Sequence, residues 1–425
     1  MDRREKTKSS WLGEVAKVIS PKYPVLNVIT QPIWNPYVER TVKIWNDQHP
    51  RGWLELKLSQ VGYESLKERV KGVIGEGEET PDLFLMDSIW VAEFAKEGLI
   101  IPLEEVDPNI FGDHLKNFYL PIVKGDSWKG KHYAIRTGCD IPLLWYRKDW
   151  FEKEKVSPPE TWDDLVKVAT HFNQPSIKEK YGLDYPLVFV AGINGGEETT
   201  FTLLPFFWSN GGDLISDKKV ALLSDQNRET LGYLKDLIHK HKIVSPEVVS
   251  YDWDVPGMLF GKGKVAMGIG GARPLTIIQE NANWTSEEAK QKFGTTTLPI
   301  PPNGKRVANT GGMAYAICEG SKNKEVALDI IKLITGKEIM YEFCVKRGLL
   351  PVRKDVVEMI KSDFLIKTSK YLEFAKTRPN LSNYSEISRQ FQTMLERALS
   401  ESLSVEDALK GAAESVSFIT EYQKI

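Results

Sequence analysis

The chain has 425 residues, of which 41% are hydrophobic and 27% charged, a composition typical of a globular protein with two core-bearing units. Its 56 basic and 58 acidic side chains leave a formal net charge of −2. No basic excess is available to neutralise phosphates, so we expect no nucleic acid partner. The sequence has no apolar run of the roughly 20 residues that span a bilayer.

The first residues, Met1 to Lys6, lack the apolar core of an export signal. We therefore expect either a cytosolic protein or an exported one whose signal was removed and replaced by a start methionine. Residues 11–19 have helical apolar spacing and predict a short helix packed on the body. The three cysteines, Cys139, Cys318 and Cys344, contain no CxxC pair and are expected to be buried free thiols.

Strands and helices are expected to alternate over residues 25–103. The patterns indicate strands at 25–29, 54–58 and 83–86, with helices between them. This βαβαβ order predicts a parallel sheet covered by helices. Ligands of such sheets bind beyond the carboxyl ends of the strands. That rule selects five site candidates, Trp34, Asn35, Tyr63, Asp87 and Trp90.

The next stretch, Tyr133 to Leu165, is typical of a strand that crosses from one unit into another. A β-prone run from Ile141 to Tyr146 leads to a Pro158-Pro159 turn. Thr161 is a suitable N-cap for the helix that follows. Asp140 lies on the crossing itself, where a carboxylate can face a cleft, although it could instead serve as a structural cap or salt-bridge partner.

The second unit is expected to be more helical than the first. Its signals are a helix at 165–172, an aromatic stretch at 200–208 and a strand at 265–269 that ends at Gly270-Gly271. A proline-rich connector at 298–302 predicts a second crossing. The chain is then expected to return to the first unit, with a strand at 313–317 and helices at 324–334 and 338–346. A third crossing is expected at 348–353. The tail, 364–425, is expected to be mostly helical.

The order of these segments resembles the extracellular sugar-binding proteins of ABC importers, the family of solute-binding proteins that includes the maltose- and trehalose-binding proteins. The matching pieces are Pro81 to Leu83, Gly98 to Leu103, Trp145 to Asp149, Pro158 to Leu165, Phe260 to Met267, Ser321 to Ala327 and Gly348 to Arg353. Residues 378–388 look most like the trehalose/maltose branch. Two features depart from the family pattern: the start lacks a lipidated cysteine or signal peptide, and the first crossing reads Arg136-Thr137-Gly138-Cys139-Asp140.

The resemblance implies an α/β protein of the periplasmic-binding-protein-like type II class, with two α/β lobes joined by several hinge crossings around a ligand cleft. We expect residues 1–24 to be an N-terminal extension. We expect 25–137 with 303–346 to form lobe 1 and 138–300 with 347–425 to form lobe 2. The hinges are expected near 137–141, 299–303 and 345–351.

A sugar site needs polar partners around the ring edge and aromatic plates on the ring faces. Trp34, Trp90, Trp208 and Trp253 lie at element ends or beside turns and could either line the cleft or belong to the core. The resemblance adds Gly271 and Arg273 to the site candidates, from a strand-end loop where the backbone approaches the ligand. Gly312 could approach the ligand in the same way or belong to a plain loop. It also adds Arg378 as a hydroxyl clamp, or else an ion-pair partner, and Tyr384 as an aromatic wall.

Enzyme functions find little support, because the sequence has no GxSxG elbow, HExxH helix or Walker A loop. A glycosidase with paired carboxylates and a sugar-sensing receptor domain are the alternatives. The favoured function is an ABC importer's substrate-binding protein that closes on a disaccharide or short oligosaccharide, trehalose- or maltose-like, and delivers it to membrane permease subunits. We expect a monomer without cofactor or metal, located outside the cytoplasm in the periplasm or anchored at the cell surface.

Overall fold

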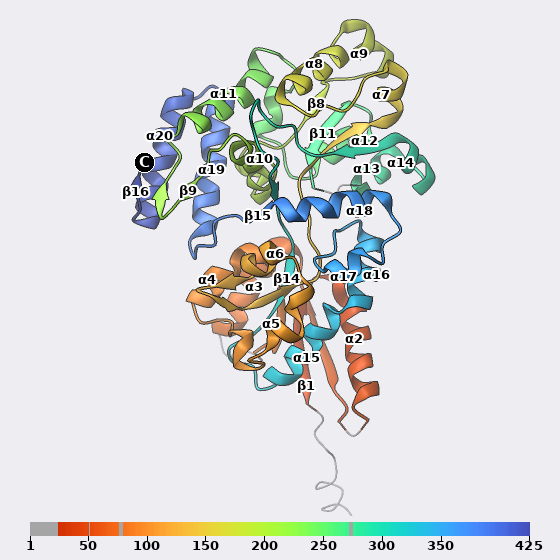
Figure 1. The fold of residues 1–425 in the computed structure, drawn as a ribbon, viewed down its shortest axis with the longest axis vertical. Helices are drawn as coiled ribbons and strands as arrows, with labels where there is room; N and C mark the ends of the chain where they lie inside the picture. Colours follow the sequence, from red (N-terminus) through yellow and green to blue (C-terminus); the bar gives the residue numbers. More distant parts are fainter. Residues whose placement is uncertain (1–23, 51, 76–79, 272–274) are drawn as a thin grey trace, which may run out of the picture.

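The computed structural model describes residues 24–50, 52–75, 80–271 and 275–425 and shows two α/β lobes stacked along the long axis (Figure 1). The helix expected at 11–19 and the role expected for Arg273 lie outside these residues. Among the helices of the described ranges, none is both long and apolar enough to cross a membrane.

The first lobe is built on a five-stranded sheet with the order β2-β1-β3-β14-β6. Its strands are β1 (Val25–Thr30), β2 (Glu55–Gln60), β3 (Leu83–Asp87), β6 (Ala134–Arg136) and β14 (Met313–Ile317). Strand β1 pairs in parallel with β2 and β3, which confirms the expected βαβαβ unit. Strand β14 lies between β3 and β6 and is antiparallel to both, so a late segment of the chain completes the first sheet.

Helices cover this sheet because each presents an apolar stripe to it. In α2 (Asn35–Gln48) the buried side chains include Tyr37, Val38, Val42 and Trp45, a helical spacing that faces the core. The other helices of this lobe are α3 (Tyr63–Gly75), α4 (Val91–Lys96), α5 (Ile110–Asp113), α6 (Leu120–Gly125), α15 (Lys324–Ile334), α16 (Lys337–Arg347) and α17 (Lys354–Val357). The helices expected at 324–334 and 338–346 are thereby confirmed.

The second lobe is built on a four-stranded sheet with the order β12-β7-β11-β8. Its strands are β7 (Leu143–Arg147), β8 (Leu187–Val188), β11 (Met267–Gly270) and β12 (Phe293–Thr296). The indole of Trp145 lies over β11, where a Cβ at Gly268 or Gly270 would approach the ring to 2.9 or 2.5 Å. Glycine at these two positions therefore makes room for the tryptophan that anchors the sheet.

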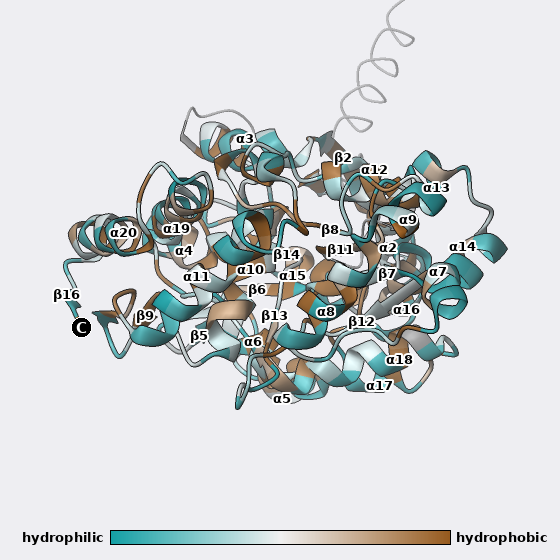
Figure 2. Ribbon diagram, turned by 90° about the horizontal axis from the view of Figure 1, so that it is seen from above, coloured by the Kyte–Doolittle hydropathy of each residue, from teal (hydrophilic) through white to brown (hydrophobic). Residues whose placement is uncertain are grey.

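Helices of seven to sixteen residues surround the second sheet. They are α7 (Lys148–Glu154), α8 (Trp162–Phe172), α9 (Pro175–Tyr181), α10 (Glu197–Ser209), α11 (Asp225–His239), α12 (Val255–Gly261), α13 (Leu275–Ala282), α14 (Ser286–Lys292), α19 (Tyr384–Leu399) and α20 (Val405–Thr420). The helical tail expected beyond residue 364 is confirmed by α18 (Asp363–Ser369), α19 and α20. Helix α14 and other outer segments are hydrophilic, whereas hydrophobic segments gather toward the interior (Figure 2).

Helix α8 begins with the expected cap. The Thr161 hydroxyl accepts the backbone N–H of Asp164 at 3.1 Å, and the Asp164 carboxylate accepts the Thr161 N–H in return. We expect Thr161→Ala to lower the free energy of unfolding by about 1 kcal/mol, because the N–H of Asp164 loses its side-chain acceptor. Urea unfolding measures the change. Thr393→Ala on the exposed face of α19 is the control, and an equal loss in both variants would contradict the capping role.

Three segments of the chain, around Cys139, Gly311 and Leu350, lie side by side where the chain passes between the lobes. The N–H of Cys139 donates to the Leu350 carbonyl at 2.8 Å, and Leu350 donates back to Cys139 at the same distance. Asp140 and Gly311 exchange an equivalent pair of bonds at 3.0 Å. In the segment expected as the second hinge, 299–303, the Ile300 carbonyl accepts the N–H of Trp162, and the hinge positions stay a prediction. The residue bounds of the lobes stay a prediction.

The cysteines fulfil the expectation of buried free thiols. Burial raises the pKa of Cys139 to about 12 and that of Cys318 to about 11, so both thiols stay protonated at neutral pH.

Candidate functional site

Three of the residues selected by the strand-end rule lie together at the edge of the first sheet. Tyr63 begins α3, and its hydroxyl donates to Asp87 Oδ2 at 2.8 Å. Asp87 ends β3, and its Oδ1 accepts the N–H of Ile89 at the start of the short helix η2 (Ser88–Trp90). The ring of Trp90 stacks on Tyr63 with centroids 5.9 Å apart. The carboxylate of Asp87 and the rings of Tyr63 and Trp90 thus lie next to one another at the edge of the first sheet.

The electrostatics of Tyr63 show how closely this group is packed. Burial, followed by the charge of Asp87 and the hydrogen bond to it, raises the pKa of the Tyr63 hydroxyl well above its ordinary value. The phenol therefore stays protonated and acts as a hydrogen-bond donor. Its pKa is also raised by Glu197 and lowered by Arg378, which belong to the second lobe, so charges from both lobes reach it.

A second polar cluster is centred on Glu197, the first residue of α10. Its carboxylate accepts from Arg378 Nη1 at 2.6 Å, from the Tyr384 hydroxyl and from Ser388 Oγ at 2.6 Å. Arg378 and Tyr384 are 6% and 1% exposed, so the cluster is built into the lobe rather than spread on its surface. Both residues were expected in the site, whereas Glu197 was missed. Its only sequence signal is an acidic pair after Gly195-Gly196 at a helix start.

The two clusters face each other across the space between the lobes. Helix α19, which carries Tyr384 and Ser388, contacts η2 of the first lobe. Lys67 Nζ of α3 donates to Ser385 Oγ of α19 at 3.2 Å. Glu197 and Asp87, one from each lobe, both raise the pKa of the Arg378 guanidinium. The lobes are therefore in contact in this structure.

A small interlobe cavity lies beside these clusters. It is lined by Ser88, Ile89, Gly125, Arg136, Thr310, Thr377, Arg378, Pro379 and Asn380. Three of its buried polar atoms have no hydrogen-bond partner among the described residues: Arg136 Nη1, Arg378 Nε and Thr310 Oγ1. Buried polar groups are normally paired, so this wall is suited to a polar ligand. Sequence reasoning noted Arg136 only as a departure from the family pattern and missed Thr310.

Asp140, Gly271 and Gly312 are each packed closely against a neighbouring segment of the chain. A Cβ at Gly271 would come within 2.2 Å of Asp140 Oδ2, so the carboxylate packs directly on this glycine. Asp140 Oδ1 also accepts the N–H of Ile141 at 2.8 Å. Gly312 has a φ of 151°, and a Cβ there would lie 2.5 Å from the Gly138 carbonyl oxygen. The absence of a side chain at Gly312 therefore allows its backbone to pack against the Gly138 carbonyl.

The remaining candidates have other surroundings. Trp34 is buried and stacks on Phe343 with centroids 3.6 Å apart, which places it in the core of the first lobe. Asn35 begins α2 beside it. Trp208 is buried in the second core, and its indole N–H donates to Asp213 Oδ1 at 2.8 Å. Trp253 precedes α12 and is 41% exposed. For Trp34 and Trp208, and for Trp90, which is 6% exposed and belongs to a buried apolar cluster, the structure favours the core alternative.

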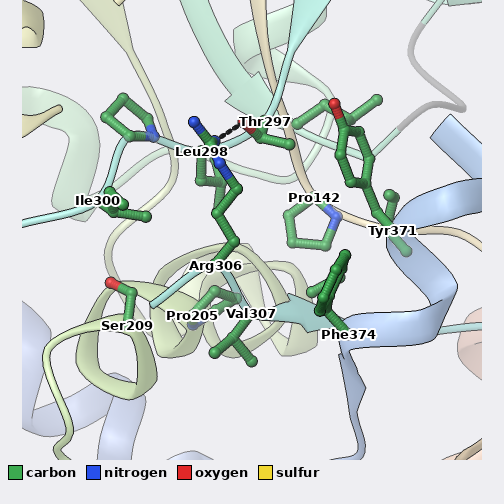
Figure 3. A pocket seen from close by; sticks show the side chains of 14 residues that line it. Pro142, Pro205, Ser209, Thr297, Leu298, Ile300, Arg306, Val307, Tyr371 and Phe374 are labelled. Atoms are coloured by element: carbon green, nitrogen blue, oxygen red, sulfur yellow. Dashed lines mark hydrogen bonds between the residues drawn. The ribbon is translucent and has the colours of Figure 1, made fainter. Parts of the chain in front are cut away.

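A second pocket lies elsewhere, between α10, the connector after β12 and the short helix η7 (Lys370–Phe374). Pro142, Pro205, Leu298, Val307 and Phe374 give it a mostly apolar wall, and Arg306 reaches across it to Thr297 (Figure 3). None of the expected site residues is among the described residues that line it. With few free polar groups, it is less suited to a sugar than the interlobe cavity.

Two α/β lobes, adjacent crossings and polar clusters on facing lobes define a two-lobed binding protein of the type II periplasmic-binding-protein-like class. The chain belongs to the bacterial extracellular solute-binding protein family, whose sequence model matches residues 28–341. The resemblance inferred from the motifs is thereby confirmed.

Curated relatives and a solved structure extend this assignment. The chain is 26% identical over 351 residues to a Brucella abortus (strain 2308) protein named only as a binding protein, covering 81% of this chain and 79% of that one. It is 26% identical over 306 residues to the arabinooligosaccharide-binding protein of Bacillus subtilis (strain 168), covering 71% and 66% of the two chains. The structure of maltose-bound MalE3 from T. maritima superposes with a TM-score of 0.76 at 26% identity, covering 93% of this chain and all of that one.

Proposed function

We propose that this protein is the substrate-binding protein of an ABC importer and binds a disaccharide or short oligosaccharide, maltose-like or trehalose-like, between its lobes. The observation that carries this proposal is the pair of facing clusters around Asp87 and Glu197, together with the polar cavity beside them, which Arg378 lines. The named relatives that bind an arabinooligosaccharide or maltose support the ligand class.

The chemistry of the clusters matches that of a sugar. Tyr63 offers an aromatic ring for the C–H face of a pyranose, and Trp90, which is 6% exposed and stacks on both Tyr63 and Phe94, supports that ring from behind. Asp87, Asp140 and Arg378 supply charged partners, whose hydrogen bonds to hydroxyls are stronger than those of neutral groups. No step of this function requires covalent chemistry.

Hinge closure would couple binding to transport. A ligand that contacts both lobes binds the closed form more tightly than the open one, and it can shift the equilibrium only by that difference in affinity. The three adjacent crossings allow such a rotation because they are short backbone segments between two packed lobes. The closed form would then be recognised by the permease outside the cytoplasm.

A carbohydrate panel tests the ligand class. We expect maltose, trehalose, maltotriose or arabinotriose to raise the melting temperature and to bind in isothermal titration calorimetry without turnover. Stabilisation follows from selective binding to the folded state. If no carbohydrate shifts the melting temperature while peptides or metal ions do, the proposal is wrong.

The Asp140→Ala variant tests the place of the site. We expect it to fold normally and to bind the sugar about 10-fold more weakly, as for loss of one charged hydrogen bond. Asp236→Ala, a partly exposed residue of α11 that pairs with Lys240, is the matched control and should keep the affinity. Unchanged affinity in folded Asp140→Ala would remove this residue from the site.

A further inference from the structure

Arg136, at the end of β6, is one of the residues that line the interlobe cavity. The residue is 2% exposed, and its Nε donates to Asp126 Oδ1 at 2.7 Å. A Cβ at Gly125 would lie 2.7 Å from Arg136 Nη2 and 2.8 Å from the Thr377 side chain. Gly125 and Thr377 both line the cavity, so the guanidinium lies at its edge. Its Nη1 has no partner among the described residues.

Arg378 approaches the same cavity from the other side of the segment 310–312. Its Nη1 binds Glu197, its Nη2 donates to the Thr310 carbonyl at 3.1 Å, and its Nε has no partner among the described residues. A Cβ at Gly311 would lie 3.6 Å from Arg378 Nη2, and one at Gly312 would lie 3.4 Å from Arg136 Cδ. The segment 310–312 therefore runs between two buried arginines, each with one donor left over.

The charges around these donors are already balanced. Asp126 pairs with Arg136, Glu197 pairs with Arg378, and Asp87 adds a further carboxylate that acts on Arg378. Burial raises the pKa of Asp126 to about 6, so at neutral pH this carboxylate is charged and neutralises its arginine. A carboxylate or phosphate on the ligand would enter without a free positive charge to compensate its desolvation. A hydroxyl or ether oxygen can accept from both donors without that cost.

We propose that Arg136 is a ligand-binding residue and that it, Arg378 and Thr310 hold a hydroxyl-bearing end of a neutral sugar, to the exclusion of acidic sugars and sugar phosphates. This inference rests on the proposed function and narrows its substrate class. It assigns a binding role to a residue at the base of the first crossing, so the ligand would contact the hinge itself.

The test compares Arg136→Lys with Arg353→Lys. Lysine at 136 keeps the charge and a bond to Asp126 but removes the Nη1 donor. Arg353 is a similarly buried arginine that binds Asp355 at 3.0 and 2.8 Å and does not line the cavity. We expect Arg136→Lys to weaken binding of maltose, trehalose or arabinotriose about 10-fold. We expect Arg353→Lys to leave the affinity unchanged.

Gly125→Ala is a second test, because its methyl group would displace the Arg136 guanidinium without removing any polar group from the chain. We expect a similar loss of sugar affinity. Wild-type protein should also bind maltobionate, trehalose 6-phosphate and digalacturonate at least 10-fold more weakly than the neutral sugars.

The outcomes separate the two proposals. If a neutral sugar binds the wild type but both Arg136→Lys and Gly125→Ala keep its affinity, Arg136 is not a ligand-binding residue, although the proposed function stands. Tighter binding of an acidic probe than of its neutral counterpart overturns the neutral class. If none of the six probes binds, the proposed function fails, and this inference fails with it.

Discussion

Glu197→Ala is expected to lower the free energy of unfolding by about 3–5 kcal/mol, because it leaves the buried Arg378 guanidinium without its carboxylate partner. The Tyr384 hydroxyl and Ser388 Oγ lose an acceptor in the same step. Removal of one member of a buried ion pair costs far more than the pair itself contributes, since the remaining charge stays desolvated. Urea unfolding at neutral pH measures the loss.

Two further variants make this result specific. Glu406→Ala removes an exposed carboxylate that binds Arg228 on the surface, and we expect a much smaller change. The double variant Glu197→Leu/Arg378→Met replaces both charges with apolar groups of similar volume and should recover part of the stability while losing sugar binding. Equal losses in Glu197→Ala and Glu406→Ala would contradict the central place of Glu197.

His114→Gln is expected to flatten the loss of stability in acid. His114 Nε2 lies 2.8 Å from Thr335 Oγ1, and burial, reinforced by Arg353 and Lys332, lowers the pKa of the imidazole from 6.5 to about 4. Between pH 6.5 and 4 the unfolded chain gains a proton that the folded chain does not. This difference should cost the wild type about 3 kcal/mol over that range. Glutamine can keep the bond to Thr335 without titrating.

Unfolding in urea at pH 7 and pH 4 compares the two proteins. The wild type should lose more stability than His114→Gln by about that amount, with the difference appearing below pH 6.5. Asp126 changes the free energy of unfolding with pH in the opposite direction to His114. Its pKa is raised in the folded state, so its contribution is present at low pH and is lost as the pH rises toward about 6. Identical pH profiles for wild type and variant would show that His114 does not titrate differently on folding.

The fold and half of the site could be predicted from local patterns. Strands at 25–29, 83–86 and 313–317 were read from apolar runs, and the strand-end rule brought Tyr63, Asp87 and Trp90 together because parallel strands end at one edge. These inferences succeed because periodicity and topology are properties of the backbone.

The rest of the site depends on side-chain contacts between residues far apart in sequence. Glu197 binds Arg378 over 181 positions, and no spacing in the sequence signals such a pair. For two tryptophans, the sequence suggested a place in the site that the structure does not give them. Trp34 and Trp208 follow turns as ligand-binding aromatics do, but tertiary packing places them in the cores. Arg136 looked like a local irregularity until the structure placed it beside Gly125 and Gly312.

Strand β14 has a consequence for synthesis of the chain. It fills the gap between β3 and β6 in the first sheet, far along the sequence from both (Figure 1). Until residue 317 has left the ribosome, β3 and β6 have no common neighbour and expose unpaired strand edges, which are prone to wrong pairing. The first lobe therefore cannot finish folding before most of the second has been made. Contacts of such long sequence separation slow folding, so the nascent chain stays incompletely folded for most of its synthesis.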